Sequence, residues 1–83
     1  MRVLSQIVHT KEVDFFGHTL TVPNWVDYLA ADSDGKVWGY EVYEPVLNDH
    51  HTKWAPDMDE YLYEEMAEVD LEGMDWTQTL VKL

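Results

Sequence analysis

The amino-acid sequence predicts an α+β fold, in which a small antiparallel sheet of three or more strands, built from hairpins, carries one acidic amphipathic helix. Two β-prone segments, residues 13–22 and 25–43, each contain a central turn with a glycine. Apolar residues then recur at helical spacing between residues 57 and 73. No repeat, low-complexity tract or Gly/Ser linker divides the chain, so residues 1–83 are expected to form a single domain.

The first hairpin is predicted from a change of periodicity that follows an ambiguous N-terminal segment. Residues 2–10 combine apolar spacing that suits a helix with β-branched residues that suit a strand, so both alternatives stay open. Residues 19–22 then alternate polar and apolar side chains, and Gly17 supplies a turn before them. Pro23 is expected to end the second strand of this hairpin.

The clearest local signal is Asp34-Gly35, because an Asp-Gly pair between two β-prone runs is typical of a hairpin turn. The two strands are expected within residues 25–31 and 36–43. Gly39 is expected to mark a bulge or a close backbone approach. The second strand should place three residues on one face: Trp38, Tyr40 and Val42.

The helix is predicted after a polar connection that spans residues 46–56. Asp57 and Glu60 match a capping box in which Asp replaces the usual Ser or Thr. Gly73 ends the helical pattern, and residues 76–83 are expected to form either a short last strand or a docking helix. One apolar stripe of the helix would contain Met58, Leu62, Met66 and Val69.

The charge balance narrows the classes of partner. Seventeen acidic and five basic residues give a net charge of −12 at pH 7, whereas a magnitude of about 2–8 keeps a small domain soluble. This excess disfavours direct binding to nucleic acid or to an anionic membrane and favours a basic protein surface. The absence of Cys, of a long apolar run and of a signal-peptide pattern predicts a cytosolic protein without disulfides.

The acidic residues concentrate in the C-terminal third of the chain. Between residues 54 and 81 there is no Lys or Arg, and the acidic residues are Asp57, Asp59, Glu60, Glu64, Glu65, Glu68, Asp70, Glu72 and Asp75. Four of them would share one helical face: Asp57, Glu60, Glu64 and Glu68. Steps of four residues rise about 6 Å along a helix, close to the roughly 7 Å that two nucleotide steps span on one DNA strand.

This pattern predicts an acidic recognition surface of the DNA-mimic kind. The alternatives are recognition of another basic protein surface and a face that is merely solvated, although solvated faces usually mix Glu with Lys. Tyr63 lies beside the acidic residues and is expected to serve as an interface anchor. The predicted partner-binding residues are therefore Asp57, Glu60, Tyr63, Glu64, Glu65, Glu68, Asp70 and Glu72.

Residues 25–54 contain the pattern Trp-Val-x-Tyr-Leu-Ala-Ala-Asp-x-Asp-Gly-x-Val-Trp-Gly-Tyr-Glu, then Pro45, then Trp54 after a polar loop. This segment, about a third of the chain, resembles a group of short acidic bacteriophage proteins of unassigned function. The resemblance implies a phage context, in which small acidic proteins often block a host protein and some mimic DNA. It implies no functional residues.

Charge and resemblance together predict a phage-type inhibitor of a basic host protein in the bacterial cytosol. The expected partner belongs to the nucleic-acid-binding classes: a restriction enzyme, a CRISPR effector, a recombination nuclease or a transcription factor. The alternative is a phage accessory or assembly protein that binds through its sheet edge or its aromatic surface.

No motif in the sequence indicates catalysis, a cofactor or a metal site. The segment from Asp32 to Glu41 matches part of a calcium-binding loop, but Ala30 occupies the first ligand position and Pro45 would obstruct the exiting helix. Residues 49–51, Asp-His-His, are predicted to be a surface loop, because adjacent His side chains on an extended chain point apart. Without a serine nucleophile motif or a Gly-rich phosphate loop, a binding protein is expected, not an enzyme.

Overall fold

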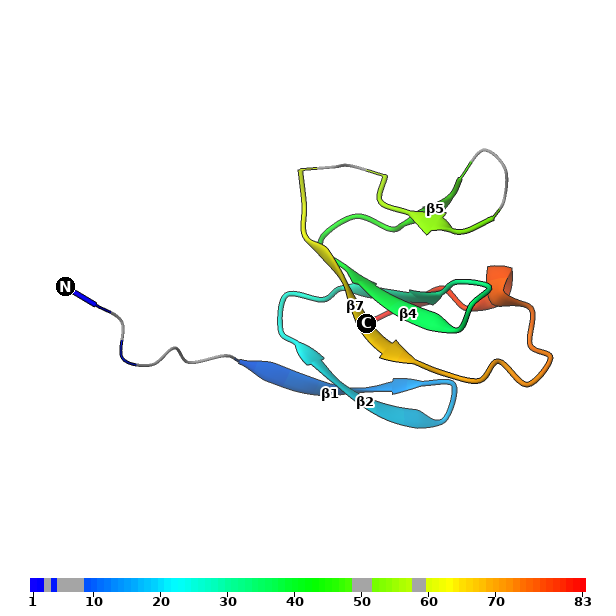
Figure 1. Cartoon of the computed structure of the whole chain (residues 1–83), viewed down its shortest axis with the longest axis horizontal. Coiled ribbons are helices and arrows are strands. Elements are labelled where there is room, and N and C mark those ends of the chain that lie inside the picture. Colours follow the sequence, from blue (N-terminus) through cyan, green and yellow to red (C-terminus); the bar gives the residue numbers. More distant parts are fainter. Residues whose placement is uncertain (3, 5–8, 49–51, 58–59) are drawn as a thin grey trace.

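The computed structural model describes residues 1–2, 4, 9–48, 52–57 and 60–83 (Figure 1). Within these residues the chain is built from antiparallel strands and one 3-10 helix, and no helix is long and apolar enough to cross a membrane. In chain order the elements are β1 (Thr10–Phe15), β2 (His18–Pro23), β3 (Tyr28–Ala31), β4 (Lys36–Tyr40), β5 (Val46–Leu47), β6 (Trp54–Ala55), β7 (Tyr63–Glu68), η1 (Trp76–Gln78) and β8 (Val81–Lys82).

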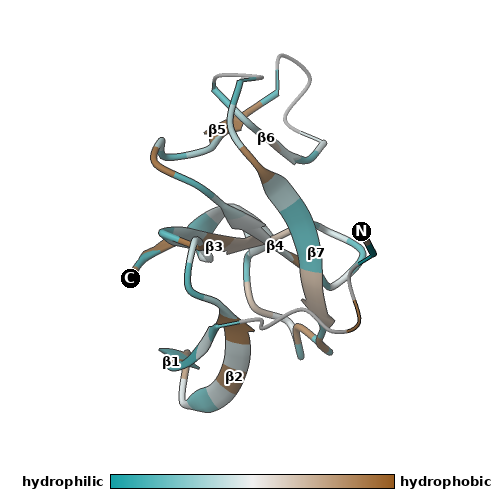
Figure 2. Cartoon of the chain, turned by 90° about the vertical axis from the view of Figure 1, so that its left-hand side faces the viewer, coloured by the Kyte–Doolittle hydropathy of each residue, from teal (hydrophilic) through white to brown (hydrophobic). Residues whose placement is uncertain are grey.

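A four-stranded sheet in the order β7-β4-β3-β8 forms the centre of the molecule. The hairpins β1–β2 and β5–β6 form separate two-stranded sheets. Figures 1 and 2 place the β1–β2 hairpin on one side of the central sheet and the β5–β6 hairpin on the other. Strand β7 is consequently an edge strand whose outer side has no partner strand within the described residues.

The β1–β2 hairpin confirms the predicted turn at Gly17. Phe15 pairs with His18, so the turn has two central residues, and both have positive φ: 51° at Phe16 and 84° at Gly17. Two positive φ angles are the signature of a type I′ turn, which matches the twist of the flanking strands and is favoured by Asn or Gly. Phe16 is therefore an unusual residue at its position.

The β3–β4 hairpin at Asp34-Gly35 is also confirmed. Asp32 and Lys36 close the turn through a backbone hydrogen bond of 2.9 Å, and the Gly35 N–H donates to the Asp32 carbonyl at 2.9 Å. Gly35 has a φ of 86°, so the loop contains three residues and ends on a left-handed glycine. The close backbone approach predicted at Gly39 is not found, because the atoms that a Cβ would meet belong to the side chains of Met66 and Val26, each at 3.0 Å. The register shift lies between Val37 and Trp38.

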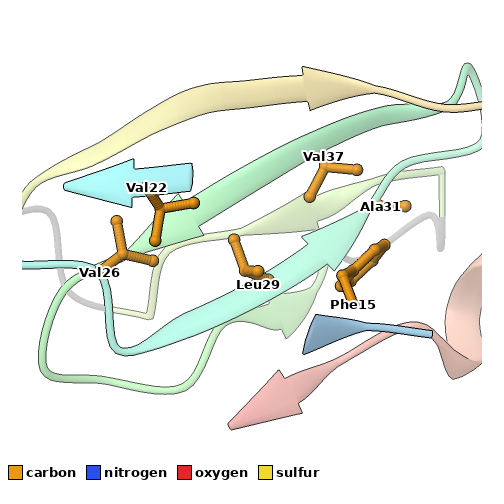
Figure 3. Packing of buried hydrophobic residues seen from close by; sticks show 6 residues of the cluster. All are labelled: Phe15, Val22, Val26, Leu29, Ala31 and Val37. Carbon is orange, nitrogen blue, oxygen red and sulfur yellow. The ribbon is translucent and has the colours of Figure 1, made fainter. Parts of the chain in front are cut away.

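One face of the central sheet packs against the β1–β2 hairpin. The buried residues of this cluster are Phe15, Val22, Val26, Leu29, Ala31 and Val37 (Figure 3). They come from the β1–β2 hairpin, from the β3–β4 hairpin and, for Val26, from the segment between them. Within the β3–β4 hairpin, cross-strand neighbours such as Ala31 and Val37 point to the same face. Burial of these aliphatic side chains fixes the hairpin on the sheet, at roughly 25 cal/mol per Å² of apolar surface removed from water.

The opposite face of the sheet carries an aromatic cluster. Ala30, Tyr40 and Trp54 are buried there, and η1 contributes Trp76 beside them. The indole N–H of Trp54 donates to the Trp76 carbonyl at 3.3 Å, which links the β5–β6 hairpin to the C-terminal segment. The predicted shared face of Trp38 and Tyr40 is present, whereas Val42 lies beyond the end of β4.

The predicted amphipathic helix is wrong, and with it the α+β fold class. Residues 63–68 form β7, which pairs antiparallel with β4 in the register Tyr40↔Tyr63 and Lys36↔Glu68. A bulge shifts this register between Val37 and Trp38, so that both Met66 and Ala67 pack against the core. Two inward residues in succession disturb the period of two that would have indicated a strand in the sequence.

The capping box and the buried apolar stripe predicted for this helix are wrong as well. No helix begins at Asp57 and Glu60, and Leu62 is 52% exposed where the stripe required a buried residue. Met58 and Asp59 lie outside the described residues, as do 49–51 and most of the ambiguous segment 2–10. The connection 46–56 contains the short strands β5 and β6, and the C-terminal segment contains both a helical turn, η1, and a strand, β8.

Candidate acidic binding surface

Strand β7 and the turn after it bring together five exposed acidic residues, here called the acidic edge: Glu64, Glu65, Glu68, Asp70 and Glu72. Figure 2 shows hydrophilic residues in β7 along the side of the sheet that carries no further strand. Because β7 is an edge strand, its outward side chains and its unpaired backbone groups both face solvent.

The bulge in β7 sets the direction of the carboxylates. Glu65 lies opposite Trp38 and Glu68 lies opposite Lys36, so both acidic residues are on the face that carries the aromatic cluster. Trp38 and Lys36 are two residues apart, which separates Glu65 and Glu68 by about 7 Å along the strand. Glu64 lies opposite Gly39 and therefore belongs to the other face.

Few cations neutralise the acidic edge. Lys36 Nζ lies 3.7 Å from Glu65 Oε1, and this is the one ion pair within the described residues. Both side chains are close to half exposed, so the pair contributes little to stability. The remaining carboxylates of the acidic edge keep their charge available to a partner.

The turn after β7 holds two of the carboxylates in a defined geometry. Glu72 and Gly73 have φ angles of 50° and 86°, and the Met74 N–H donates to the Leu71 carbonyl at 2.8 Å, as in a type I′ turn. The Asp70 carboxylate accepts the Glu72 N–H at 2.9 Å. Asp70 and Glu72 are thus presented by a fixed turn, and Asp70 keeps its second oxygen for another partner.

Asp75 follows this turn and caps η1. Its carboxylate accepts the Thr77 hydroxyl at 2.7 Å and the Thr77 N–H at 3.0 Å. These two hydrogen bonds, the side-chain one first, lower the pKa of Asp75 below its ordinary value.

At the other end of β7 lies a group of apolar and aromatic residues, all exposed except the half-buried Tyr61 and here called the aromatic corner: Val42, Tyr43, Tyr61, Leu62 and Tyr63. The Glu41 N–H donates to the Leu62 carbonyl at 3.0 Å and continues the pairing of β4 with β7. The Tyr43 and Tyr61 rings pack with centroids 5.1 Å apart. Tyr63 stacks on Tyr40 at 6.1 Å and 12° and is still 44% exposed, as an interface anchor would be.

Val42 lies in a strained backbone conformation within the aromatic corner. Its φ is 67°, and the Tyr43 N–H donates to the Glu41 carbonyl at 2.7 Å, which makes a three-residue γ-turn of the rare positive-φ kind. A β-branched residue in this region is a genuine outlier. The Asp27 carboxylate accepts the Val42 N–H at 2.8 Å and holds the turn in place.

The structure arranges six of the eight predicted partner-binding residues along one edge and not on one helical face. Tyr63, Glu64, Glu65 and Glu68 belong to β7, and Asp70 and Glu72 follow it directly. The exposed Asp57 and Glu60 precede β7 and lie outside any strand or helix.

Sequence reasoning singled out Tyr63 and missed the other residues of the aromatic corner. The sequence places Val42 and Tyr43 at the end of a predicted strand and Leu62 in the buried stripe of the predicted helix. The signal that could have found Val42 and Tyr43 is their position immediately before Glu44-Pro45, where a strand must end.

The residues of the partial calcium-loop motif form the β3–β4 turn. The Asp34 carboxylate accepts the Lys36 N–H at 3.0 Å, and the Asp32 carboxylate accepts the Trp54 N–H at 2.9 Å. Burial raises the pKa of Asp32, against the lowering effect of that backbone hydrogen bond. No group of three or more His, Asp or Glu side chains suited to a metal ion was found within the described residues.

Comparison of the chain with protein-family models, with curated proteins and with solved structures gave no match.

Proposed function

We propose that this protein is a phage-type inhibitor that binds a basic, nucleic-acid-binding host protein through the acidic edge. The observation that carries the proposal is the sign of the charges: five exposed carboxylates line one edge and its turn, with a single cation paired to them within the described residues. A partner with a basic groove would find complementary charge there, which speeds association and selects against acidic partners.

Protection of the sheet edge explains part of this pattern. Charged side chains on an edge strand discourage the addition of another strand, and Lys serves this purpose at least as well as Glu. Edge protection therefore explains why β7 is charged, but not why every charged residue from 57 to 72 is acidic. The uniform sign favours a surface that recognises a basic partner.

The strand geometry is compatible with mimicry of DNA. Residues on one face of a strand repeat about every 7 Å, which is the distance that two nucleotide steps span on one DNA strand. Glu65 and Glu68 have this separation because of the bulge. The proposed partners are accordingly the proteins whose basic sites bind nucleic acid in the bacterial cytosol: restriction, CRISPR, recombination or transcription factors.

The proposal is tested by capture from a bacterial lysate on the immobilised protein at low salt. A protein captured through an electrostatic surface is released by a step to about 300 mM NaCl, where the Debye length falls to roughly 6 Å, and by added duplex DNA. Capture that resists both treatments would contradict the proposal, as would equal capture by the Glu64→Lys, Glu68→Lys double variant.

The aromatic corner supports a second candidate, a phage accessory or assembly protein. Strain in exposed backbone often marks a functional site, and the γ-turn at Val42 pushes apolar side chains into solvent. Binding through this corner would survive moderate salt, because apolar contacts are not screened. Substitution of Tyr43 and Leu62 by Ser would then abolish capture, whereas the acidic-edge variant would not.

A further inference from the structure

A pocket of about 440 Å³ lies between the turn of the β1–β2 hairpin and the connection from β7 to η1. Its volume falls within the range of about 300–1,000 Å³ that is typical of ligand sites. The hairpin contributes Phe15, Phe16 and His18, and the connection contributes residues 69–72 and Met74. The pocket is therefore built by two segments far apart in sequence and adjoins the acidic edge at Asp70.

The hairpin side of the pocket is aromatic. The Phe15 and Phe16 rings meet edge to face with centroids 4.9 Å apart and an interplanar angle of 86°. Phe15 is buried, whereas Phe16 is 43% exposed at the rim. Phe16 stands at a left-handed position of a type I′ turn, where Asn or Gly is favoured. The turn itself does not explain the aromatic residue, but an aromatic wall for a bound group does.

The opposite side of the pocket combines carboxylates with apolar surface. Asp70 and Glu72 both line it, and Leu71 and the 43% exposed Met74 lie beside them. Neither carboxylate takes part in the one ion pair of the described residues. The Asp70 side chain is oriented by its hydrogen bond to the Glu72 N–H, so its charge has a fixed place at the pocket.

We infer that this pocket binds an arginine side chain of the basic partner. A planar guanidinium can stack on an aromatic ring and at the same time donate to carboxylates, a combination that a lysine ammonium meets less well. The apolar stem of arginine would contact Leu71 and Met74. This inference rests on the proposed function, since it assigns to the acidic edge the pocket in which a partner is anchored.

The test uses two capped tripeptides, acetyl-Gly-Arg-Gly-amide and its citrulline counterpart, titrated into the ¹⁵N-labelled full chain. Citrulline keeps the shape of arginine and removes its charge. We expect saturable amide shifts at Phe16, Leu71, Glu72 and Met74 with the arginine peptide, and none of comparable size with the citrulline peptide. Equal shifts from both peptides, or shifts spread evenly over acidic residues such as Glu12, would overturn the pocket.

Two substitutions test the pocket without endangering the fold. Phe16→Asn removes the aromatic wall and places a favoured residue in the turn. It should weaken binding of the arginine peptide about fivefold to tenfold. Asp70→Asn keeps an oxygen for the Glu72 N–H and removes the charge, with a similar loss expected. The matched control is Glu12→Gln on β1, which changes the net charge equally and should leave the affinity unchanged.

The proposed arginine pocket and the proposed function can be contradicted by different results. Unchanged affinity in Phe16→Asn and Asp70→Asn would overturn the pocket, and the acidic edge would still be judged by capture from lysate. Loss of capture in the charge-reversed β7 variant, together with an intact arginine-peptide titration, would support both.

Discussion

Thr79 is the buried polar residue on which the C-terminal segment depends. Its hydroxyl oxygen accepts the Ala31 N–H at 2.8 Å and lies 2.6 Å from the Trp76 carbonyl, to which the hydroxyl can donate. The pairing of β3 with β8 ends at Leu29↔Val81, so Thr79 supplies the acceptor that the short strand β8 does not reach. One side chain thus completes the backbone hydrogen bonding of β3.

Thr79→Val is expected to lower the free energy of unfolding by about 1–3 kcal/mol, because the isosteric side chain leaves the buried Ala31 N–H without an acceptor. Thr79→Ser is the matched control, since it keeps the hydroxyl and loses one methyl group, at about 1 kcal/mol. Urea denaturation of both variants measures the difference. A Thr79→Val variant as stable as the parent would show that the hydrogen bond contributes nothing.

Asp32 makes the stability depend on pH. Burial raises its folded-state pKa above the ordinary value of 3.8, so the folded state binds its proton more tightly than the unfolded state does. Ionisation of Asp32 therefore lowers the free energy of unfolding as the pH rises through and above that value. The backbone hydrogen bond from Trp54 must still be accepted by the side chain.

Asp32→Asn keeps an oxygen for the Trp54 N–H and removes the partly buried charge and its repulsion from Asp34. We expect a higher melting temperature than the parent at pH 7, with a gap that closes as the pH falls below 3.8, where the parent side chain is protonated in both states. Thermal unfolding across this pH range measures the gap. A difference in melting temperature that widens toward low pH would contradict the effect assigned to Asp32.

Among the elements, the β3–β4 hairpin shows how the edge strand is fixed to the sheet. A Cβ at Gly35 would overlap the backbone oxygen of Val69, and the Val69 N–H donates to the Gly35 carbonyl at 2.8 Å. The turn of the β3–β4 hairpin thus contacts Val69, the residue that directly follows β7. Gly35 is needed for its left-handed φ and also for its missing side chain.

Gly35→Ala is expected to cost about 2–5 kcal/mol, because a left-handed alanine is strained and its methyl group displaces the Val69 backbone. Gly73→Ala serves as the control: its φ is also 86°, but a Cβ there meets nothing within 4 Å, so only the strain of about 1–2 kcal/mol remains. Equal losses in chemical denaturation would remove the role assigned to the Gly35–Val69 contact.

Both major hairpins were predictable from the sequence, and the edge strand was not. Gly17 and Asp34-Gly35 act locally, since a positive φ at a turn is a property of a few adjacent residues. The segment 63–68, Tyr-Glu-Glu-Met-Ala-Glu, contains good helix formers and becomes a strand because β4 offers an unpaired edge and the core accepts Met66 and Ala67. Tertiary pairing of this kind overrides local propensity.

The candidate site was predicted in composition but not in geometry. The acidic residues from 57 to 72 are visible in the sequence, whereas their arrangement depends on the bulge and on the turn at Glu72-Gly73. The pocket was not predictable, because it forms where the Phe16 turn meets the connection after β7. Contacts between segments more than 50 residues apart leave no periodic signal in one sequence.

At the scale of the whole molecule, a central sheet covered by a hairpin on each face leaves its strand edges as the free surface. The β1–β2 hairpin covers one face and the β5–β6 hairpin the other, so β7 remains open along one side of the sheet. A net charge of −12 destabilises a compact chain through self-repulsion. The proposed binding of a basic partner by the acidic edge would give that excess of negative charge a function.

The central claim is tested most directly by the affinity of three proteins for the partner captured from lysate: the parent, the Glu64→Lys, Glu68→Lys variant, and a Glu12→Lys, Asp14→Lys control on β1. Both variants change the net charge equally, and each replaces two exposed residues of a strand. The lysines keep β7 protected as an edge, so the variant should remain folded.

We expect the β7 variant to bind about a hundredfold or more weakly at low salt, because like charges placed opposite a basic groove cost several kcal/mol. The β1 control should bind nearly as the parent does, apart from a small long-range effect. If the folded β7 variant binds and competes with duplex DNA as well as the parent, the acidic edge only protects the sheet, and the proposed function is wrong.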